Sequence, residues 1–151
     1  MTRSGFTIDE AVIIAAPAEH VWRALVDDPV RESWWPYLRL DATVGGTFEE
    51  TWTDAEGRLR RTQGTITELV PHRLLRLDWA DRDWEAVTDV QITLEELGDV
   101  DLPTGDQPRC RSTNVRVRHV GWELLPNGPS LVEEHQQGWR MHLSNLRNLW
   151  E

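Results

Sequence analysis

The chain has 151 residues, of which 39% are hydrophobic and 28% charged, a composition typical of one globular domain. Sixteen Arg and no Lys stand against 26 Asp and Glu, which gives a net charge of −10. This acidity makes duplex nucleic acid and anionic membranes poor partners, and the absence of Lys excludes Schiff-base chemistry on a lysine of the protein.

The sequence has none of the segments expected of a membrane or secreted protein. No apolar run approaches the ~20 residues of a membrane helix, and residues 1–10 contain no apolar signal core. The single cysteine, Cys110, excludes an internal disulfide and is typical of a reducing compartment. We therefore expect a cytoplasmic protein that does not insert into membranes.

Tryptophan is unusually abundant, since nine Trp stand against one Tyr and two Phe. Indole is large, rigid and amphipathic, and its N–H needs a hydrogen-bond partner when it is buried. So many Trp side chains indicate either a Trp-rich core or a cavity with aromatic walls, and composition does not decide between the two.

Hydrophobic patterning predicts one strand, two short helices, six further strands and one long final helix. Residues 8–16 are typical of a strand, Pro17 precedes a helix over 18–26, and Asp28-Pro29 begins a second helix that ends at 34–36. Turns rich in Gly, Pro and Asp separate the later strands. These strands are predicted over residues 38–44, 48–52, 59–69, 74–79, 87–97 and 113–122.

A polar loop from Gly98 to Arg109 precedes the last strand, and the final segment is helical. Ser130 and Glu133 match a capping box, after which apolar and aromatic residues recur every three to four positions up to residue 150. This helix is the only element large enough to cover the apolar face of an antiparallel sheet. We therefore predict a single α+β domain over residues 1–151, with a ligand cavity between sheet and helix.

No motif of a nucleotide, hydrolase or metal site is present. The sequence lacks a Walker A loop, a G-x-G-x-x-G turn after a strand, G-x-S-x-G and H-E-x-x-H, and its Cys and His residues do not have metal-ligand spacing. We expect neither a metal nor a cofactor.

Strand parity provides two weak catalytic candidates. Glu50 lies between Phe48 and Trp52 on the predicted inward face, and His119 lies on the apolar side of the last strand. A buried carboxylate is paired, protonated or hydrated, so Glu50 is either an acid with a raised pKa that faces a ligand or is turned outward by a bulge. If both face one cavity, they form a proton-transfer pair. Otherwise His119 is a core histidine.

Two further groups of aromatic residues remain open to alternative interpretations. His135, Trp139 and His142 share one face of the final helix and form either a cavity wall or a hydrogen-bonded part of the core. The Trp34-Trp35-Pro36 segment forms either a gate at the cavity mouth or a cover over the open end of the sheet.

The order and spacing of several short motifs resemble one known superfamily. The motifs are Ala16-Pro17-Ala18-Glu19 with Val21-Trp22-x-Ala24-Leu25, Trp34-Trp35-Pro36, Gly45-Gly46-x-Phe48, Gly64-x-Ile66-x-Glu68-Leu69-x-Pro71-x-Arg73-Leu74-Leu75, Trp79, Thr93-Leu94, His119-x-Gly121 and Gly138-Trp139-x-x-x-Leu143-x-x-Leu146. Over about residues 8–150 they are similar to the START-like (SRPBCC) superfamily, in the branch named after the activator of heat-shock-protein-90 ATPase.

This resemblance implies a helix-grip fold, in which a seven-stranded antiparallel sheet wraps a long C-terminal helix and two short helices follow the first strand. It also implies a cavity for apolar molecules such as lipids, sterols or polyketides. Some superfamily members are cyclases, hydrolases or self-resistance proteins, and the name of the branch comes from co-chaperones that carry an additional domain.

Our leading hypothesis is the binding of an apolar or aromatic small molecule by a monomer or homodimer. The predicted cavity wall consists of aromatic and histidine side chains, with Glu50 and His119 as the weak catalytic candidates. These wall residues are Trp34, Trp35, Phe48, Trp52, Trp79, His119, Trp139 and His142. The alternatives are a cyclase- or hydrolase-like enzyme that uses the same cavity, or a protein-interaction module of co-chaperone or self-resistance type.

Overall fold

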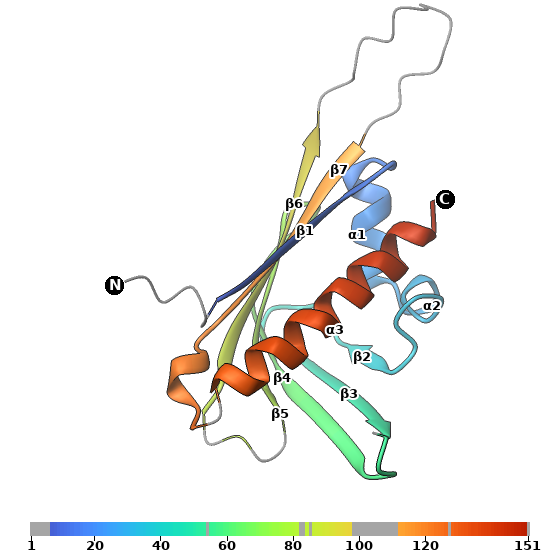
Figure 1. Cartoon of the computed structure of the whole chain (residues 1–151). Coiled ribbons are helices and arrows are strands. Elements are labelled where there is room, and N and C mark those ends of the chain that lie inside the picture. The colour runs from blue at the N-terminus through green and yellow to red at the C-terminus, as the bar shows by residue number, and fades with distance from the viewer. Residues whose placement is uncertain are drawn as a thin grey trace, which may run out of the picture.

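Seven antiparallel strands form one sheet, and the C-terminal helix lies across one of its faces (Figure 1). The computed structural model describes residues 7–53, 55–81, 84, 86–97, 112–126 and 128–150. The strands are β1 (Ile8–Ile14), β2 (Leu38–Leu40), β3 (Thr47–Thr53), β4 (Leu59–Val70), β5 (Leu74–Asp81), β6 (Thr88–Leu97) and β7 (Ser112–Val120). The helices are α1 (Ala18–Val26), α2 (Asp28–Arg31), the short 3-10 helix η2 (Trp122–Leu124) and α3 (Gly128–Asn148).

The strand order is β1-β7-β6-β5-β4-β3-β2, so the first strand closes the sheet beside the last one. Strands β2 to β7 follow one another along the chain as antiparallel neighbours. The helices α1 and α2 connect β1 to β2, and α1 contacts β6 and β7 while α2 contacts β2. This arrangement confirms the predicted α+β class and the helix-grip fold.

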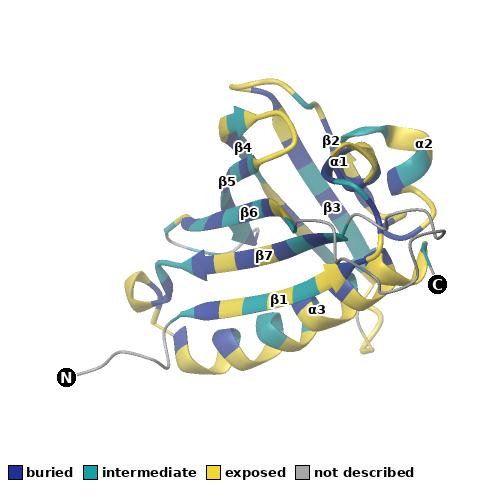
Figure 2. Cartoon of the chain, turned by 90° about the horizontal axis from the view of Figure 1, so that it is seen from above, coloured by how far each residue is buried: buried dark blue, intermediate teal, exposed yellow. Residues whose placement is uncertain are grey.

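The core lies between the sheet and α3. Burial alternates along the strands, which is clearest on β7 in Figure 2: Val115, Val117 and His119 are buried, while Arg116 and Arg118 are exposed. On α3 the buried side chains recur at helical spacing, and the opposite side of the helix is exposed (Figure 2). The buried α3 side chains that face the core are Val132, Trp139, Leu143 and Leu146.

Two glycines shape the sheet where it meets the core. Gly64 on β4 is paired with Phe48 on β3, and a Cβ at this position would lie 2.7 Å from the Phe48 ring. Gly121 ends β7 with a φ of +103°, a left-handed conformation that L side chains rarely adopt, and η2 follows at once. A larger residue would therefore clash with its neighbours at position 64 and would be strained at position 121.

Several predicted boundaries are wrong: the first strand ends at Ile14 and not at 16, and the second helix ends at Arg31 and not at 34–36. Three further differences have identifiable reasons. The strand predicted over 38–44 is only β2, because Asp41, Thr43 and Gly46 form a turn with their own hydrogen bonds. The strand predicted to reach 122 ends at Val120, since Gly121 reverses the backbone. The capping box does not begin the last helix, because α3 starts at Gly128 and Ser130 lies inside its first turn. The predicted loop from Gly98 to Arg109 lies outside the described residues.

Candidate functional site

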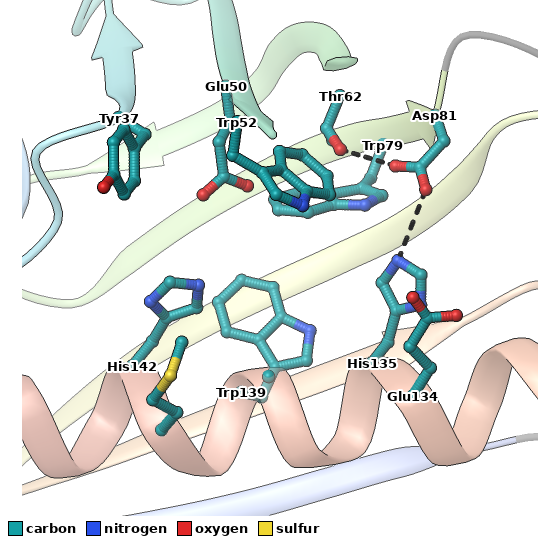
Figure 3. Close-up of a pocket in the computed structure, with 12 residues that line it drawn as sticks. Tyr37, Glu50, Trp52, Thr62, Trp79, Asp81, Glu134, His135, Trp139 and His142 are labelled. Atoms are coloured by element: carbon teal, nitrogen blue, oxygen red, sulfur yellow. Dashed lines mark hydrogen bonds and ion pairs between the residues drawn. The ribbon is translucent and has the colours of Figure 1, made fainter. Parts of the chain in front are cut away.

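A pocket of about 250 Å³ lies between α3 and the strands β3, β4 and β5 (Figure 3). The sheet forms one wall and the helix forms the other (Figure 3). The residues that line it are Tyr37, Glu50, Trp52, Thr62, Trp79, Asp81, Glu134, His135, Gly138, Trp139, Met141 and His142. A cavity of about 150 Å³ is large enough for benzene, so this pocket has room for a substituted aromatic ring.

Three indoles supply most of the apolar wall. Trp52 comes from β3, Trp79 from β5 and Trp139 from α3 (Figure 3). The rings of Trp79 and Trp139 pack with their centroids 5.2 Å apart, and Phe48 supports Trp79 at the same distance from behind the pocket. Because Trp79 and Trp139 are held on both sides, this part of the wall is preorganised.

Glu50 is the buried acid of the pocket. It lies on β3 with its side chain turned inward, and it is 7% exposed. The indole N–H of Trp35 donates a hydrogen bond to Glu50 Oε2 at 2.5 Å. Burial, with a smaller contribution from the charge of Asp81, raises the pKa of Glu50 to about 6. A carboxyl group in this state exchanges a proton near neutral pH.

A second carboxylate, Asp81, occupies one end of the pocket and has several partners. The hydroxyl of Thr62 donates a hydrogen bond to Asp81 Oδ1, and His135 Nε2 lies 3.8 Å from Oδ2 (Figure 3). Arg60 lies 4.0 Å from the same oxygen. Burial raises the pKa of Asp81, while Thr62, His135 and Arg60 oppose that rise.

Two buried ring nitrogens in the pocket wall lack a partner. Among the described residues, neither Trp79 Nε1 nor His142 Nδ1 has a hydrogen bond. His142 stacks on Trp35 with centroids 4.0 Å apart, and burial lowers its pKa to about 4. His142 is therefore neutral at pH 7. Both nitrogens are enclosed by protein atoms, so they are unsatisfied polar groups in the wall beside the pocket, which are costly for the folded chain.

His119 lies outside the pocket and is fully satisfied by the core. The indole N–H of Trp139 donates to His119 Nδ1 at 3.1 Å, which leaves the ring proton on Nε2. Nε2 then donates to the hydroxyl of Thr88 at 2.6 Å, and that hydroxyl donates to the carbonyl of Trp79. Burial, followed by the nearby His135, holds the pKa of His119 well below its usual range.

The structure divides the predicted wall residues into two groups. Trp52, Trp79, Trp139 and His142 line the pocket, together with the catalytic candidate Glu50. Trp34, Trp35, Phe48 and His119 do not line it, because they are buried in the core behind it. Trp34 donates its indole N–H to the carbonyl of Ala24, and Trp35 contacts Glu50 and His142 from the core side.

The proton-transfer pair of Glu50 and His119 is not assembled. Both side chains are buried on the inward face of the sheet, but only Glu50 reaches the pocket. The lone pair of His119 Nδ1 already accepts the Trp139 N–H, so His119 has no free base nitrogen. Glu50 remains the acid/base candidate.

Several residues that line the pocket are absent from the predicted wall, although local sequence patterns place them there. Asp81 lies beyond the strand predicted over residues 74–79, but it shares strand parity with Trp79 and ends β5 on the inward face. His135 and Gly138 share the helix face of Trp139 and His142, and so follow from helical spacing. Tyr37 gave no such signal, since it lies between elements.

Two chemical features are absent from the part of the chain that the structure describes. Within these ranges no cluster of three or more His, Cys, Asp or Glu side chains is arranged to hold a metal ion. None of the described helices combines the length and the apolar character needed to cross a membrane.

The fold and the pocket define a helix-grip protein, and comparison with known families agrees. The family described as activator of Hsp90 ATPase homolog 1-like protein matches residues 15–151. The chain belongs to this family, which confirms the resemblance found in the sequence. The comparison with curated proteins gives no match.

Solved structures share this fold at low sequence identity. Protein CV1439 from Chromobacterium violaceum is 24% identical with a TM-score of 0.69, and the match covers 97% of this chain and 98% of that one. The Aha1 dimer from Colwellia psychrerythraea is 21% identical with a TM-score of 0.68 and 96% of each chain covered. DynU16, a protein in the dynemicin biosynthetic locus, is 20% identical with a TM-score of 0.70, and the match covers 94% of this chain and 46% of that one.

Proposed function

We propose that the chain binds an apolar or aromatic small molecule in the pocket between α3 and strands β3 to β5. The observation that carries the proposal is the pocket of about 250 Å³ with three indoles in its wall. Apolar pockets with a few convergent polar groups are the usual form of small-molecule sites. Here those groups are the carboxyls of Glu50 and Asp81, which line the pocket.

Gly138 allows the pocket to be filled without disturbing the core. It lies on the pocket side of α3, and a Cβ built there meets nothing within 4 Å. Gly138→Phe therefore places a ring where a ligand would bind. Gln137→Phe is the matched control, because it adds the same ring one residue away on the exposed side of the helix.

The experiment is a fluorescence titration with the neutral dye N-phenyl-1-naphthylamine. We expect saturable 1:1 binding, with fluorescence energy transfer from Trp to the dye, in the wild type and in Gln137→Phe. Gly138→Phe should weaken dye binding at least about tenfold, because its ring occupies the pocket. Equal binding by all three folded proteins would overturn the proposal.

Glu50 favours a second function, an enzyme of cyclase or hydrolase type. A carboxyl with a pKa of about 6 in a ligand pocket matches the needs of general acid/base catalysis. Hydrolysis of p-nitrophenyl acetate tests this function. The enzyme hypothesis predicts a wild-type rate with an inflection near pH 6, which Glu50→Gln removes; equal rates for the two proteins contradict it.

The proposal also includes the assembly state of the chain and its location in the cell. The Colwellia psychrerythraea neighbour is a dimer in solution, and we carry forward a monomer or homodimer state and a cytoplasmic location for this chain. Sedimentation measurements with and without the dye decide the assembly state.

A further inference from the structure

We propose that the ligand of this pocket is an organic cation, an aromatic or apolar body whose positive charge lies beside Glu50. This inference rests on the proposed function and adds the charge of the ligand. Three carboxylates line the pocket, from Glu50, Asp81 and Glu134. Among the described residues that line it there is no arginine, in a chain with 16 of them.

The two buried carboxylates differ in how far their charge is already compensated. Asp81 has a hydroxyl donor in Thr62 and two basic side chains, His135 and Arg60, within 4.0 Å. Glu50 has one neutral donor, the Trp35 indole, and that bond uses only Oε2. The carboxylate of Glu50 extends from β3 toward the helix wall beside Trp52 (Figure 3). Glu50 is therefore the carboxylate that gains most from a cation, since a buried charge without a counter-charge is costly.

The indoles around Glu50 suit the same ligand. Trp52, Trp79 and Trp139 line the pocket from two strands and the helix. Indole faces attract cations more strongly than other aromatic faces do, and aromatic cages are a recurring site for ammonium groups. An aromatic wall and an uncompensated carboxylate thus lie in one pocket, and together they favour a cation over a neutral molecule of the same shape.

The other titratable groups around Glu50 do not supply the missing positive charge. His142 on α3 is neutral at pH 7, because burial lowers its pKa to about 4. His135 on α3 and Arg60 on β4 lie next to Asp81. Glu134 is an exposed residue of α3 that lines the pocket, and it adds a further negative charge there.

A pair of probes with one shape and two charges tests the inference. Phenyltrimethylammonium carries a permanent positive charge, and tert-butylbenzene replaces its nitrogen with carbon. Displacement of N-phenyl-1-naphthylamine from the wild-type protein measures both affinities. We expect the cation to bind at least about tenfold more tightly than the neutral probe at pH 7.5. Equal or tighter binding of the neutral probe overturns this inference alone, whereas failure of the dye and both probes to bind overturns the proposed function as well.

Two glutamine variants locate the charge that is responsible. Glu50→Gln should remove the preference for the cation and keep the affinity for tert-butylbenzene, which also shows that the pocket is intact. Glu49→Gln changes the net charge by the same amount, but Glu49 faces away from the pocket and pairs with Arg61. It should keep the preference. A preference that survives in Glu50→Gln, or is lost equally in Glu49→Gln, overturns the inference.

The pH dependence gives a second readout, because the charge of phenyltrimethylammonium does not change with pH. Its affinity should rise between pH 5 and 7 as Glu50 ionises, and this rise should be absent in Glu50→Gln. The other charged and titratable groups at the pocket, Asp81, Glu134, His135, His142 and Arg60, are present in both proteins, so the difference between the two pH profiles reports the removal of the Glu50 carboxyl. A parallel rise in both proteins contradicts the role of Glu50.

Discussion

Two neighbouring regions of the inward face use the same residue types in different ways. Around His119, each polar atom of the chain from Trp139 through His119 and Thr88 to the Trp79 carbonyl is paired. Around Glu50, the carboxyl has a single donor, and the ring nitrogens of Trp79 and His142 have no partner among the described residues. The first region is a completed polar network, and the second is an open one.

This difference separates a structural histidine cluster from the proposed binding site. Buried polar groups in native proteins are nearly always paired, so a group of unpaired ones beside a pocket indicates a missing partner. Burial alone does not distinguish the regions, since Glu50 and His119 are both buried. The two regions differ in whether their buried polar groups have hydrogen-bond partners. Substitutions in the two regions should therefore change the free energy of unfolding by different amounts.

The largest expected effect comes from breaking the completed network. His119→Leu removes two hydrogen bonds, which leaves the Trp139 N–H unpaired and the Thr88 hydroxyl without its donor, although that hydroxyl still donates to the Trp79 carbonyl. This change should lower the free energy of unfolding by about 2–4 kcal/mol. His142→Leu is the matched change in the pocket, where Nδ1 has no partner, and should stay within about 1 kcal/mol of the wild type. Urea unfolding at pH 7.5 measures both, and equal losses would erase the distinction between the two regions.

An intermediate effect follows from the pH dependence of Glu50. Its pKa is raised from 4.5 to about 6, so its contribution to stability is fully present below pH 4.5 and is lost as the pH rises through 6. The loss corresponds to about 2 kcal/mol. Glu50→Gln cannot ionise, so its stability relative to the wild type should increase by that amount between pH 4.5 and 7.5. Denaturant titrations of both proteins at the two pH values test this, and a constant difference would show that Glu50 is not desolvated.

The smallest expected change in stability concerns Gly138, on the pocket side of α3. Gly138→Ala places a methyl group into open space and improves helix propensity, which should stabilise the protein by at most about 1 kcal/mol. Gly64→Ala provides the contrast, since its Cβ would lie 2.0 Å from the carbonyl of Asp78. Thermal unfolding should show a slightly higher midpoint for the first variant and a clear loss for the second. A destabilising Gly138→Ala would mean that this side of α3 is packed.

Local sequence patterns predict most of the fold. Alternation on β7 and the spacing on α3 place Val115, Val117, His119, Trp139 and Leu146 inward, because period 2 and period 3.6 apply to each element by itself. The helix over 18–26 matches α1 at both ends. The short extent of β2 and the 3-10 helix after Gly121 depend on turn hydrogen bonds and a positive φ, which hydrophobic patterning does not report.

The site was predictable only in part. Strand parity shows on which face of the sheet a side chain lies, but it does not show which side chains of other elements it contacts. Parity places Glu50, Trp52 and Trp79 inward, and helical spacing adds Trp139 and His142. Whether an inward residue lines a cavity or the core depends on contacts between distant segments. The Trp35–Glu50 bond and the Trp139–His119 bond are such contacts, and no local pattern predicts either.

The most direct test is a set of two-dimensional NMR spectra of the nine indole N–H groups, recorded during titration with phenyltrimethylammonium and assigned with Trp→Phe variants. The N–H signals of Trp52 and Trp79 should shift with saturation. Those of Trp34 and Trp122, which donate to backbone carbonyls in the core, should stay in place. Shifts confined to Trp34 and Trp122, or no saturable shift at any indole, would contradict a ligand site at Glu50.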